Sequence, residues 1–448
     1  MKPWVRVRAG LAALFTVLAC GWLHDHRSAG AEAPAAPNVV LLIADDMAYT
    51  DYGFMGHPAI RTPRLDRLAR ESLTYRRGYA TSSLCSPSLA SILTGLYPHQ
   101  HKITSNDPPL PPGVAARDAE RSPAFLAARQ AMIGGFDSAP TLPRMLAERG
   151  YLSFEAGKWW GGSYQRGGFT HGMTSGDPAK GGRHGDLGLA IGRKTMKPIF
   201  DFIDHAQEQK KPFLVWYAPM MPHSPHNPPE RFLALYRAKA PSLEIAKYWA
   251  MCTWFDETCG QLLDFLDERK LASDTLVVFL ADNGWIQDPA ADRYAPRSKQ
   301  SPYEGGLRTP ILLRRPGTIA ARSSAVSVSE IDIAPTVLDH LGLARDPRMT
   351  GVNLLDEHAV MNRKTIFGEI FTHNAVDISD PASSLRFRWA AAGDWKLIVP
   401  HRPHETGPIE LYNLRTDPDE TTNLAAERAS RASALNRALD DWWPLPGR

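Results

Sequence analysis

The chain has 448 residues, of which 43% are hydrophobic and 22% charged, and its formal net charge is +3. This composition is typical of a globular protein with one large domain and a smaller one, and it excludes long disordered segments. Because the small net charge is spread evenly along the chain, no electrostatic footprint for nucleic acid is present, and we expect no nucleic-acid partner.

The first 33 residues are predicted to be a signal peptide. Positive charges at the start precede an apolar run over residues 11–23, and small residues follow it. That run is too short to span a bilayer comfortably, and no later run is longer, so we expect no stable membrane span. An alternative is lipid attachment at Cys20, in a segment that resembles a bacterial lipoprotein box. Both interpretations predict an exported protein, periplasmic or extracellular.

Strand-like and helix-like segments alternate over residues 34–365, which we predict to be the main domain. In chain order they are the strand 38–44, the helix that begins at Thr62 and Pro63, the helix 141–148, the strand 213–218, the long helix 243–271 and the strand 275–281. The strands are continuous apolar runs, as in strands buried on both faces of a sheet. We therefore predict an α/β domain with a mostly parallel sheet.

The last part of the chain, residues 366–448, is predicted to be a small α+β subdomain with an antiparallel sheet. Two strand-like segments, 386–392 and 395–399, are joined by a Gly-Asp turn. A third short strand is expected at 410–414, and a polar helix ends the chain.

Acidic and amide side chains follow two of the predicted strands. Asp45 and Asp46 come after the strand 38–44, and Asp282 and Asn283 come after the strand 275–281. Ligands of open parallel sheets gather at the carboxyl ends of the strands, and carboxylate and amide oxygens suit a hard cation such as Ca²⁺ or Mg²⁺. The alternative is that each pair caps a helix or forms a turn.

Cys85 precedes a predicted short helix in which Ser86 is the N-cap, Pro87 the first residue and Gly95 the closing residue. The free N–H groups and the dipole at such a helix end favour an anion. We therefore expect a lowered pKa for the Cys85 thiol, or a bound sulfate or phosphate. The alternative is a buried structural cysteine.

Two further cysteines, Cys252 and Cys259, lie seven residues apart in the predicted long helix. This spacing separates them by roughly 10 Å along the helix axis. Because that distance is beyond the reach of a disulfide, we expect both side chains to belong to the core.

Several short motifs occur along the chain in a fixed order. They are Asn38 to Asp46; the set Cys85, Pro87, Ser88, Leu93, Thr94 and Gly95; Gly157 to Trp159; Pro222 to His226; Leu280 to Gly284; Lys299 to Gly306 with Arg308 and Pro310; Gly393 to Ile398; and Glu410 to Leu414. By these motifs, which span nearly all of the mature chain, it resembles the sulfatase family of the alkaline-phosphatase superfamily. The family signature is C-x-P-S-R, three residues, then L-T-G. The resemblance implies a mixed, mostly parallel sheet sandwiched by helices.

The same resemblance implies a catalytic apparatus. A maturation enzyme would oxidise Cys85 to formylglycine, whose hydrate supplies the attacking hydroxyl. The residues implied as ligands of Ca²⁺ or Mg²⁺ are Asp45, Asp46, Asp282, Asn283 and residue 85 itself. The side chains implied as catalytic are Lys158 and Lys299, which would bind the sulfate, and His223, which would act as general acid to the leaving oxygen.

Two positions depart from the family pattern. Leu89 stands where the signature has arginine, and Trp160 stands where the family commonly has histidine. A leucine cannot hydrogen-bond an oxyanion or serve a maturation enzyme as arginine does, and the missing histidine removes a proton acceptor. His99, His101 and His171 are candidates to replace that histidine.

Three functions remain open at this point. The leading hypothesis is a sulfatase that acts on a sulfated carbohydrate or related small ester outside the cytoplasm. The second is a phosphate or phosphonate ester hydrolase on the same fold. The third is a non-catalytic protein that binds sulfated glycans, which Leu89 and Trp160 favour, while the retained acidic and basic residues favour an enzyme.

Overall fold

The structure is a computed structural model that describes residues 36–120, 122–177 and 186–445. The predicted signal peptide and Cys20 lie outside the described residues. Among those residues, no helix has both the length and the apolar character needed to cross a membrane.

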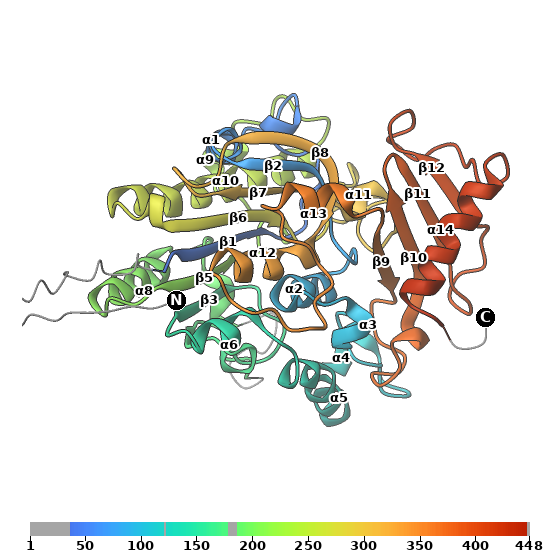
Figure 1. Ribbon diagram of the computed structural model, residues 1–448, viewed down its shortest axis with the longest axis horizontal. Helices are drawn as coiled ribbons and strands as arrows, with labels where there is room; N and C mark the ends of the chain where they lie inside the picture. Colours follow the sequence, from blue (N-terminus) through green and yellow to red (C-terminus); the bar gives the residue numbers. More distant parts are fainter. Residues whose placement is uncertain (1–35, 121, 178–185, 446–448) are drawn as a thin grey trace, which may run out of the picture. The chain divides into compact units, whose positions relative to one another are not determined.

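The larger sheet has eight strands and is mostly parallel, which confirms the predicted fold class (Figure 1). Its order is β4 (His171–Gly172), β3 (Leu152–Gly157), β5 (Phe213–Ala218), β1 (Asn38–Ala44), β6 (Thr275–Ala281), β7 (Arg308–Arg314), β2 (Leu73–Tyr79) and β8 (Arg322–Ser329). Only β7 runs antiparallel to both of its neighbours. The apolar runs 38–44, 213–218 and 275–281 are three adjacent strands with every residue buried. Burial on both faces explains why these runs lack alternation.

Helices cover both faces of this sheet. One face packs against α1 (Pro63–Arg70), α8 (Lys197–Glu208) and α10 (Leu243–Glu268). The other packs against α2 (Cys85–Thr94), α5 (Pro123–Ile133), α6 (Leu142–Ala147) and α12 (Ile333–His340). The shorter helices are α3 (Pro98–His101), α4 (Ala116–Ala119), α9 (Glu230–Leu233), α11 (Glu304–Leu307) and α13 (Glu357–Asn362).

Helix α1 begins at Pro63 as expected, but the free N–H groups of its first turn have a different hydrogen-bond partner from the one predicted. The hydroxyl of Thr62 makes no cap hydrogen bond to the helix. Instead, the carboxylate of Asp256 on α10 accepts hydrogen bonds from the N–H groups of Arg64 and Leu65, at 3.2 and 2.7 Å. A distant acid therefore replaces the local cap, which no short-range pattern reveals.

The second sheet has four antiparallel strands in the order β12 (Glu410–Asn413), β11 (Trp395–Pro400), β10 (Leu385–Ala392) and β9 (Ile366–Phe371). The final helix α14 (Ala429–Trp442) packs on one face of this sheet through Ala432, Leu435 and Leu439 (Figure 1). Both sheets belong to one compact unit that starts at Ala36.

Cys252 and Cys259 are both buried on α10 and make no disulfide, which confirms that they are core residues.

Candidate active site

The residues singled out from the sequence come together at the carboxyl ends of the central strands. Asp45 and Asp46 follow β1, and Asp282 and Asn283 follow β6, the neighbour of β1 in the sheet. Lys158 follows β3, and His223 lies in the loop after β5. Cys85 is on a helix instead, as the first residue of α2. This convergence follows from the parallel arrangement, which puts successive strand ends at one edge.

The oxygen cluster consists of Asp45, Asp46, Asp282 and Asn283, all of them buried. The N–H of Asp46 donates to Asp282 Oδ1 at 3.1 Å, and Asn283 Nδ2 donates to Asp46 Oδ1 at 2.6 Å. Three oxygens, Asp45 Oδ2, Asp282 Oδ2 and Asn283 Oδ1, accept no hydrogen bond from the described part of the chain. Buried acceptors without donors are costly, and an oxygen-preferring divalent cation would satisfy them. The residues present therefore fit a Ca²⁺ or Mg²⁺ ion.

The carboxylates of this cluster have unequal pKa values. Burial raises the pKa of Asp45 and of Asp282 to about 6 each, more than Lys158 lowers them. The pKa of Asp46 lies well below its usual range, because Lys299, His223 and Lys158 outweigh the effect of burial. A bound divalent cation would favour the ionised form of all three.

Two buried lysines provide fixed positive charge beside the cluster. Lys299 Nζ lies 2.7 Å from Asp46 Oδ2 and 3.2 Å from Cys85 Sγ. Lys158 Nζ donates to Asp45 and lies 3.6 Å from Asp282 Oδ2. The pKa of Lys158 is raised well above its ordinary value, because the neighbouring carboxylates outweigh its burial. Both ammonium groups therefore stay charged and can receive the oxygens of an anion.

The helix that carries Cys85 begins two residues earlier than predicted, at Cys85 instead of Pro87. Its N-cap is Leu84, so the prediction of Ser86 as N-cap is wrong. The reason is a distant partner, because Asn106 Oδ1 accepts the hydrogen bond from the Ser86 N–H at 2.9 Å. Gly95 closes the helix at a φ of 65°, as expected.

The prediction of a lowered pKa for the thiol is also wrong. Cys85 is 2% exposed, and burial raises the pKa of its thiol to about 11 despite Lys158 and Lys299. Desolvation of the thiolate outweighs the helix end and both ammonium groups. In this structure Cys85 is therefore protonated near neutral pH.

His223 points at the cluster with a defined tautomer. Its Nδ1 lies 2.6 Å from the Ser224 carbonyl oxygen, to which only an N–H can donate. Nε2 therefore faces Asp46 Oδ2, at 3.4 Å. Burial lowers the pKa of His223 to about 3, so the imidazole is neutral in the absence of a bound anion. Arg193 Nη2 holds the loop by donating to the His223 carbonyl at 2.8 Å.

A cavity of about 310 Å³ opens above these groups. It is lined by Cys85, Lys158, His223 and Lys299, together with Asn106, Asp107, Trp160, Met220, Ser224, Trp285, Asp292, Arg293, Tyr294, Gln300 and His373. This volume accommodates a small organic ligand such as one sugar unit. The sequence reasoning missed most of the wall, because those residues come from loops without a chemical motif. Asn106 in particular carries no local signal, because no motif of the sequence links it to Cys85.

The three histidines suggested as replacements at Trp160 do not line this cavity. His99 pairs with Glu369, and His101 Nε2 lies 3.2 Å from Ser91 Oγ beneath α2. His171 Nδ1 lies 2.9 Å from Thr170 Oγ1 at the end of β4. The histidine that does line the cavity besides His223 is His373, which the sequence reasoning did not identify.

The two departures from the family pattern have different surroundings. Leu89 is 2% exposed and packs in the apolar core between the sheet and α2, with Ile133 and Trp159 in the same cluster. Trp160 lines the cavity, and its ring lies 5.6 Å from Lys158 Nζ. An apolar side chain thus replaces the arginine, and an aromatic wall replaces the histidine.

Comparisons with known proteins agree with this arrangement. The family model described as "Sulfatase" matches residues 37–343. A second model, described as "N-sulphoglucosamine sulphohydrolase, C-terminal", matches residues 297–441. Human N-acetylgalactosamine-6-sulfatase is 29% identical over 465 residues, covering 90% of this chain and 84% of the relative.

Two solved structures show the same fold at low identity. One, described as a complex with D-glucosamine-2-N,6-O-disulfate, has a TM-score of 0.70 and 19% identity over 91% of this chain and 98% of that one. The phosphonate monoester hydrolase of Agrobacterium radiobacter has a TM-score of 0.66 and 19% identity over 90% of this chain and 94% of that one.

Proposed function

The chain belongs to the sulfatase family and is a sulfuric ester hydrolase, and we propose that it removes sulfate from a sulfated carbohydrate with a formylglycine made from Cys85 and a bound Ca²⁺ or Mg²⁺. The observation that supports this most directly is the convergence of Cys85, two buried lysines and His223 on one cavity above the oxygen cluster. Relatives named for sulfated amino sugars support a carbohydrate substrate.

The oxygen cluster would hold the cation. A cage of four protein oxygen ligands favours Ca²⁺ over Mg²⁺, which usually keeps several waters. A formylglycine at position 85 would supply the attacking hydroxyl, and a bound cation would lower the pKa of that hydroxyl.

The other residues bind the sulfate and move a proton. Lys158 and Lys299 bind the sulfate oxygens from buried positions, where charge stabilisation is strong. His223 Nε2 gives a proton to the leaving oxygen. A bound sulfate brings negative charge next to the imidazole, which raises the pKa of His223 and favours its protonated form.

We also propose that the protein is exported through its N-terminal segment to the periplasm or beyond, with Cys20 as an alternative lipid attachment site. A formylglycine-generating enzyme would then be its partner during maturation.

Mass spectrometry of the tryptic peptide from Gly78 to Lys102, on protein exported by its native host, tests the proposal. We expect conversion of Cys85 to the lighter aldehyde. The same protein is then assayed on one aryl group presented as sulfate, phosphate and phosphonate ester, with Cys85→Ala as the control. We expect the highest kcat/KM for the sulfate ester and loss of that activity in the variant.

Two outcomes would contradict the proposal. Higher kcat/KM for the phosphoryl esters would identify a phosphate or phosphonate ester hydrolase. An intact thiol, together with tight binding of sulfated glycans and no sulfate release over days, would identify the glycan-binding alternative that Leu89 and Trp160 favour.

A further inference from the structure

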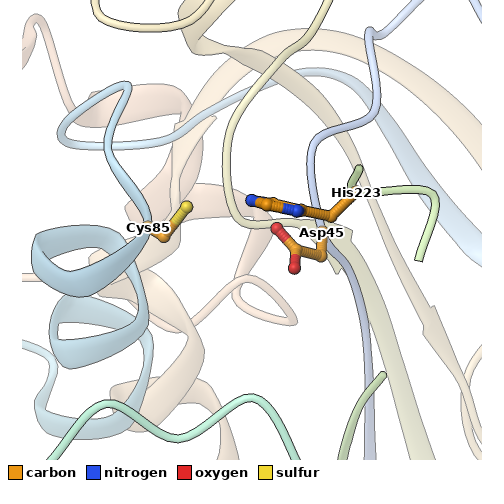
Figure 2. Close-up of side chains that lie close together, drawn as sticks. All are labelled: Asp45, Cys85 and His223. Carbon is orange, nitrogen blue, oxygen red and sulfur yellow. The ribbon is translucent and has the colours of Figure 1, made fainter. Parts of the chain in front are cut away.

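A second set of potential metal ligands lies beside the oxygen cluster. Ligand atoms of Asp45, Cys85 and His223 all lie within 4.8 Å of one another. Figure 2 shows the sulfur of Cys85 and the imidazole of His223 directed toward one another, with the Asp45 carboxylate beside them. Sulfur, imidazole nitrogen and carboxylate oxygen together are the donor set of Zn²⁺ rather than of Ca²⁺.

Each of the three side chains offers one potential ligand atom within this distance. Because His223 Nδ1 donates to the Ser224 carbonyl at 2.6 Å, the lone pair of the neutral ring is on Nε2. A backbone carbonyl on the other ring nitrogen is the usual support of a zinc-bound histidine. Asp45 Oδ2 is buried and accepts no hydrogen bond from the described residues. Cys85 Sγ is within hydrogen-bond reach of Lys299 Nζ, at 3.2 Å, and a thiolate there would stay paired with that ammonium.

The charges of the site balance with one divalent cation. The three carboxylates of the oxygen cluster and the two lysines paired with them leave one net negative charge. A thiolate at Cys85 adds a second, and one Zn²⁺ neutralises both. A Ca²⁺ in the oxygen cluster together with a Zn²⁺ would leave two positive charges uncompensated in a buried site, which is costly.

We propose that the chain with Cys85 in its encoded thiol form binds one Zn²⁺ through Cys85 Sγ, His223 Nε2 and Asp45 Oδ2, leaving a fourth position open to water or an anion. The Cys85 S–H bond breaks as the sulfur–zinc bond forms, and the proton goes to solvent. Since this site shares Asp45 with the oxygen cluster, Zn²⁺ and Ca²⁺ bind in competition. The inference does not rest on the sulfatase proposal, which concerns the chain after Cys85 has been modified.

The test uses the full chain purified with Cys85 unmodified, as verified by mass spectrometry. Equilibrium dialysis against Zn²⁺ followed by metal analysis measures stoichiometry and affinity, and Co²⁺ replacement reports a thiolate ligand by its charge-transfer absorption. We expect one Zn²⁺ per chain, a charge-transfer band with Co²⁺, and at least about tenfold weaker binding in Cys85→Ser and in His223→Ala.

Two matched variants control for other sites. Cys259→Ser removes another buried thiol and should leave Zn²⁺ affinity and the Co²⁺ band unchanged. Asn283→Ala removes a ligand of the oxygen cluster alone, so it should weaken Ca²⁺ binding and leave Zn²⁺ binding intact. Zn²⁺ affinity that is unaffected by Cys85→Ser, or a Co²⁺ spectrum without a thiolate band, would overturn the inference. Neither result would affect the sulfatase proposal, which is decided by the state of Cys85 and by ester hydrolysis.

Discussion

His223 has a fixed tautomer and a pKa lowered by burial, and these two properties determine how it can transfer a proton. Its Nδ1–H is committed to the Ser224 carbonyl, so proton exchange with a substrate takes place at Nε2. Burial holds its pKa at about 3 without a ligand, so the proton must be stabilised by the charge of the bound sulfate. Negative charge on a bound sulfate therefore favours the protonated, acidic form of His223.

Replacing this acid should affect poor leaving groups most. We expect His223→Asn to reduce kcat for an alkyl or sugar sulfate by about 10²- to 10⁴-fold, and to reduce it much less for 4-nitrophenyl sulfate, whose leaving oxygen needs no proton. Steady-state kinetics with both esters measure the two effects. His358→Asn, at an exposed position on α13, is the control. Equal losses for both esters would contradict a role in protonation.

At the scale of single elements, α2 is the support of Cys85. All ten of its residues are buried, its N-terminus is held by Asn106, and Gly95 ends it in the left-handed region. A β-carbon on Gly95 would lie 3.2 Å from Met349 Cγ and from Pro335 Cδ. Gly150, which ends the turn after α6 at a φ of 80°, has no neighbour within 4 Å of such an atom.

This difference predicts unequal effects of alanine at the two glycines. Gly150→Ala should lower the free energy of unfolding by about 1–2 kcal/mol, because only the left-handed backbone conformation is penalised. Gly95→Ala should cost more, because steric contact with α12 is added, and it should also lower activity by displacing Cys85. Urea denaturation and ester hydrolysis of both variants test this. Indistinguishable unfolding midpoints would show that the space around Gly95 adjusts.

A buried acid on β3 makes stability depend on pH. Burial raises the pKa of Glu155 to about 8, while its oxygens accept hydrogen bonds from the N–H and hydroxyl of Thr174. The unfolded chain loses this proton near the ordinary value of 4.5, and the folded chain keeps it up to about 8. Between these two pKa values the folded state binds more protons than the unfolded state. The contribution of Glu155 to the free energy of unfolding therefore falls as pH rises from 4.5 to about 8.

Glu155→Gln should remove this contribution. A glutamine can accept from the Thr174 N–H and donate to the Thr174 hydroxyl, so the contacts are retained. We expect the variant to be more stable than the wild type at pH 8 and to differ little from it near pH 4.5. Thermal unfolding across this range is the measurement, with the exposed Glu148→Gln as control. A constant difference at every pH would contradict the assignment.

At the scale of the whole described molecule, the second sheet is joined to the first by buried charge. Lys396 on β11 is fully buried and lies 3.1 Å from Glu304 Oε1 on α11 and 2.9 Å from Glu420 Oε1. The C-terminal segment also completes the cavity, because His373 follows β9 and its carbonyl accepts the hydrogen bond from the Asn106 N–H at 3.0 Å. The second sheet is thus part of the site and of the core.

Removing the charge at this junction should be strongly destabilising. We expect Lys396→Met to lower the free energy of unfolding by about 3–5 kcal/mol, because two buried carboxylates lose their cation. Adding Glu420→Gln should restore part of this loss. Lys364→Met, at an exposed position, should change it by less than about 0.5 kcal/mol. Denaturant unfolding of the three proteins provides the values, and a double variant no more stable than Lys396→Met would contradict the charge argument.

Much of the element pattern could be read from local sequence. The strands 38–44, 213–218 and 275–281 match the structure at both ends, because an uninterrupted apolar run is itself the requirement for a strand buried on both faces. Helix starts were less predictable. At Thr62 and Ser86 the expected local caps are replaced by Asp256 and Asn106, which the fold brings from elsewhere.

The sequence by itself determined the functional side chains, that is, the motif residues, their order and the family to which the chain belongs. Their side-chain types and short spacings carry that information without a fold. Only the tertiary structure decided the aromatic wall at Trp160 and Trp285, the inclusion of His373, and the protonation of Cys85. The physical reason is that burial and contact are properties of segments far apart in the chain. The pKa of the thiol depends on Lys299, more than two hundred residues away, and on the burial of Cys85 itself.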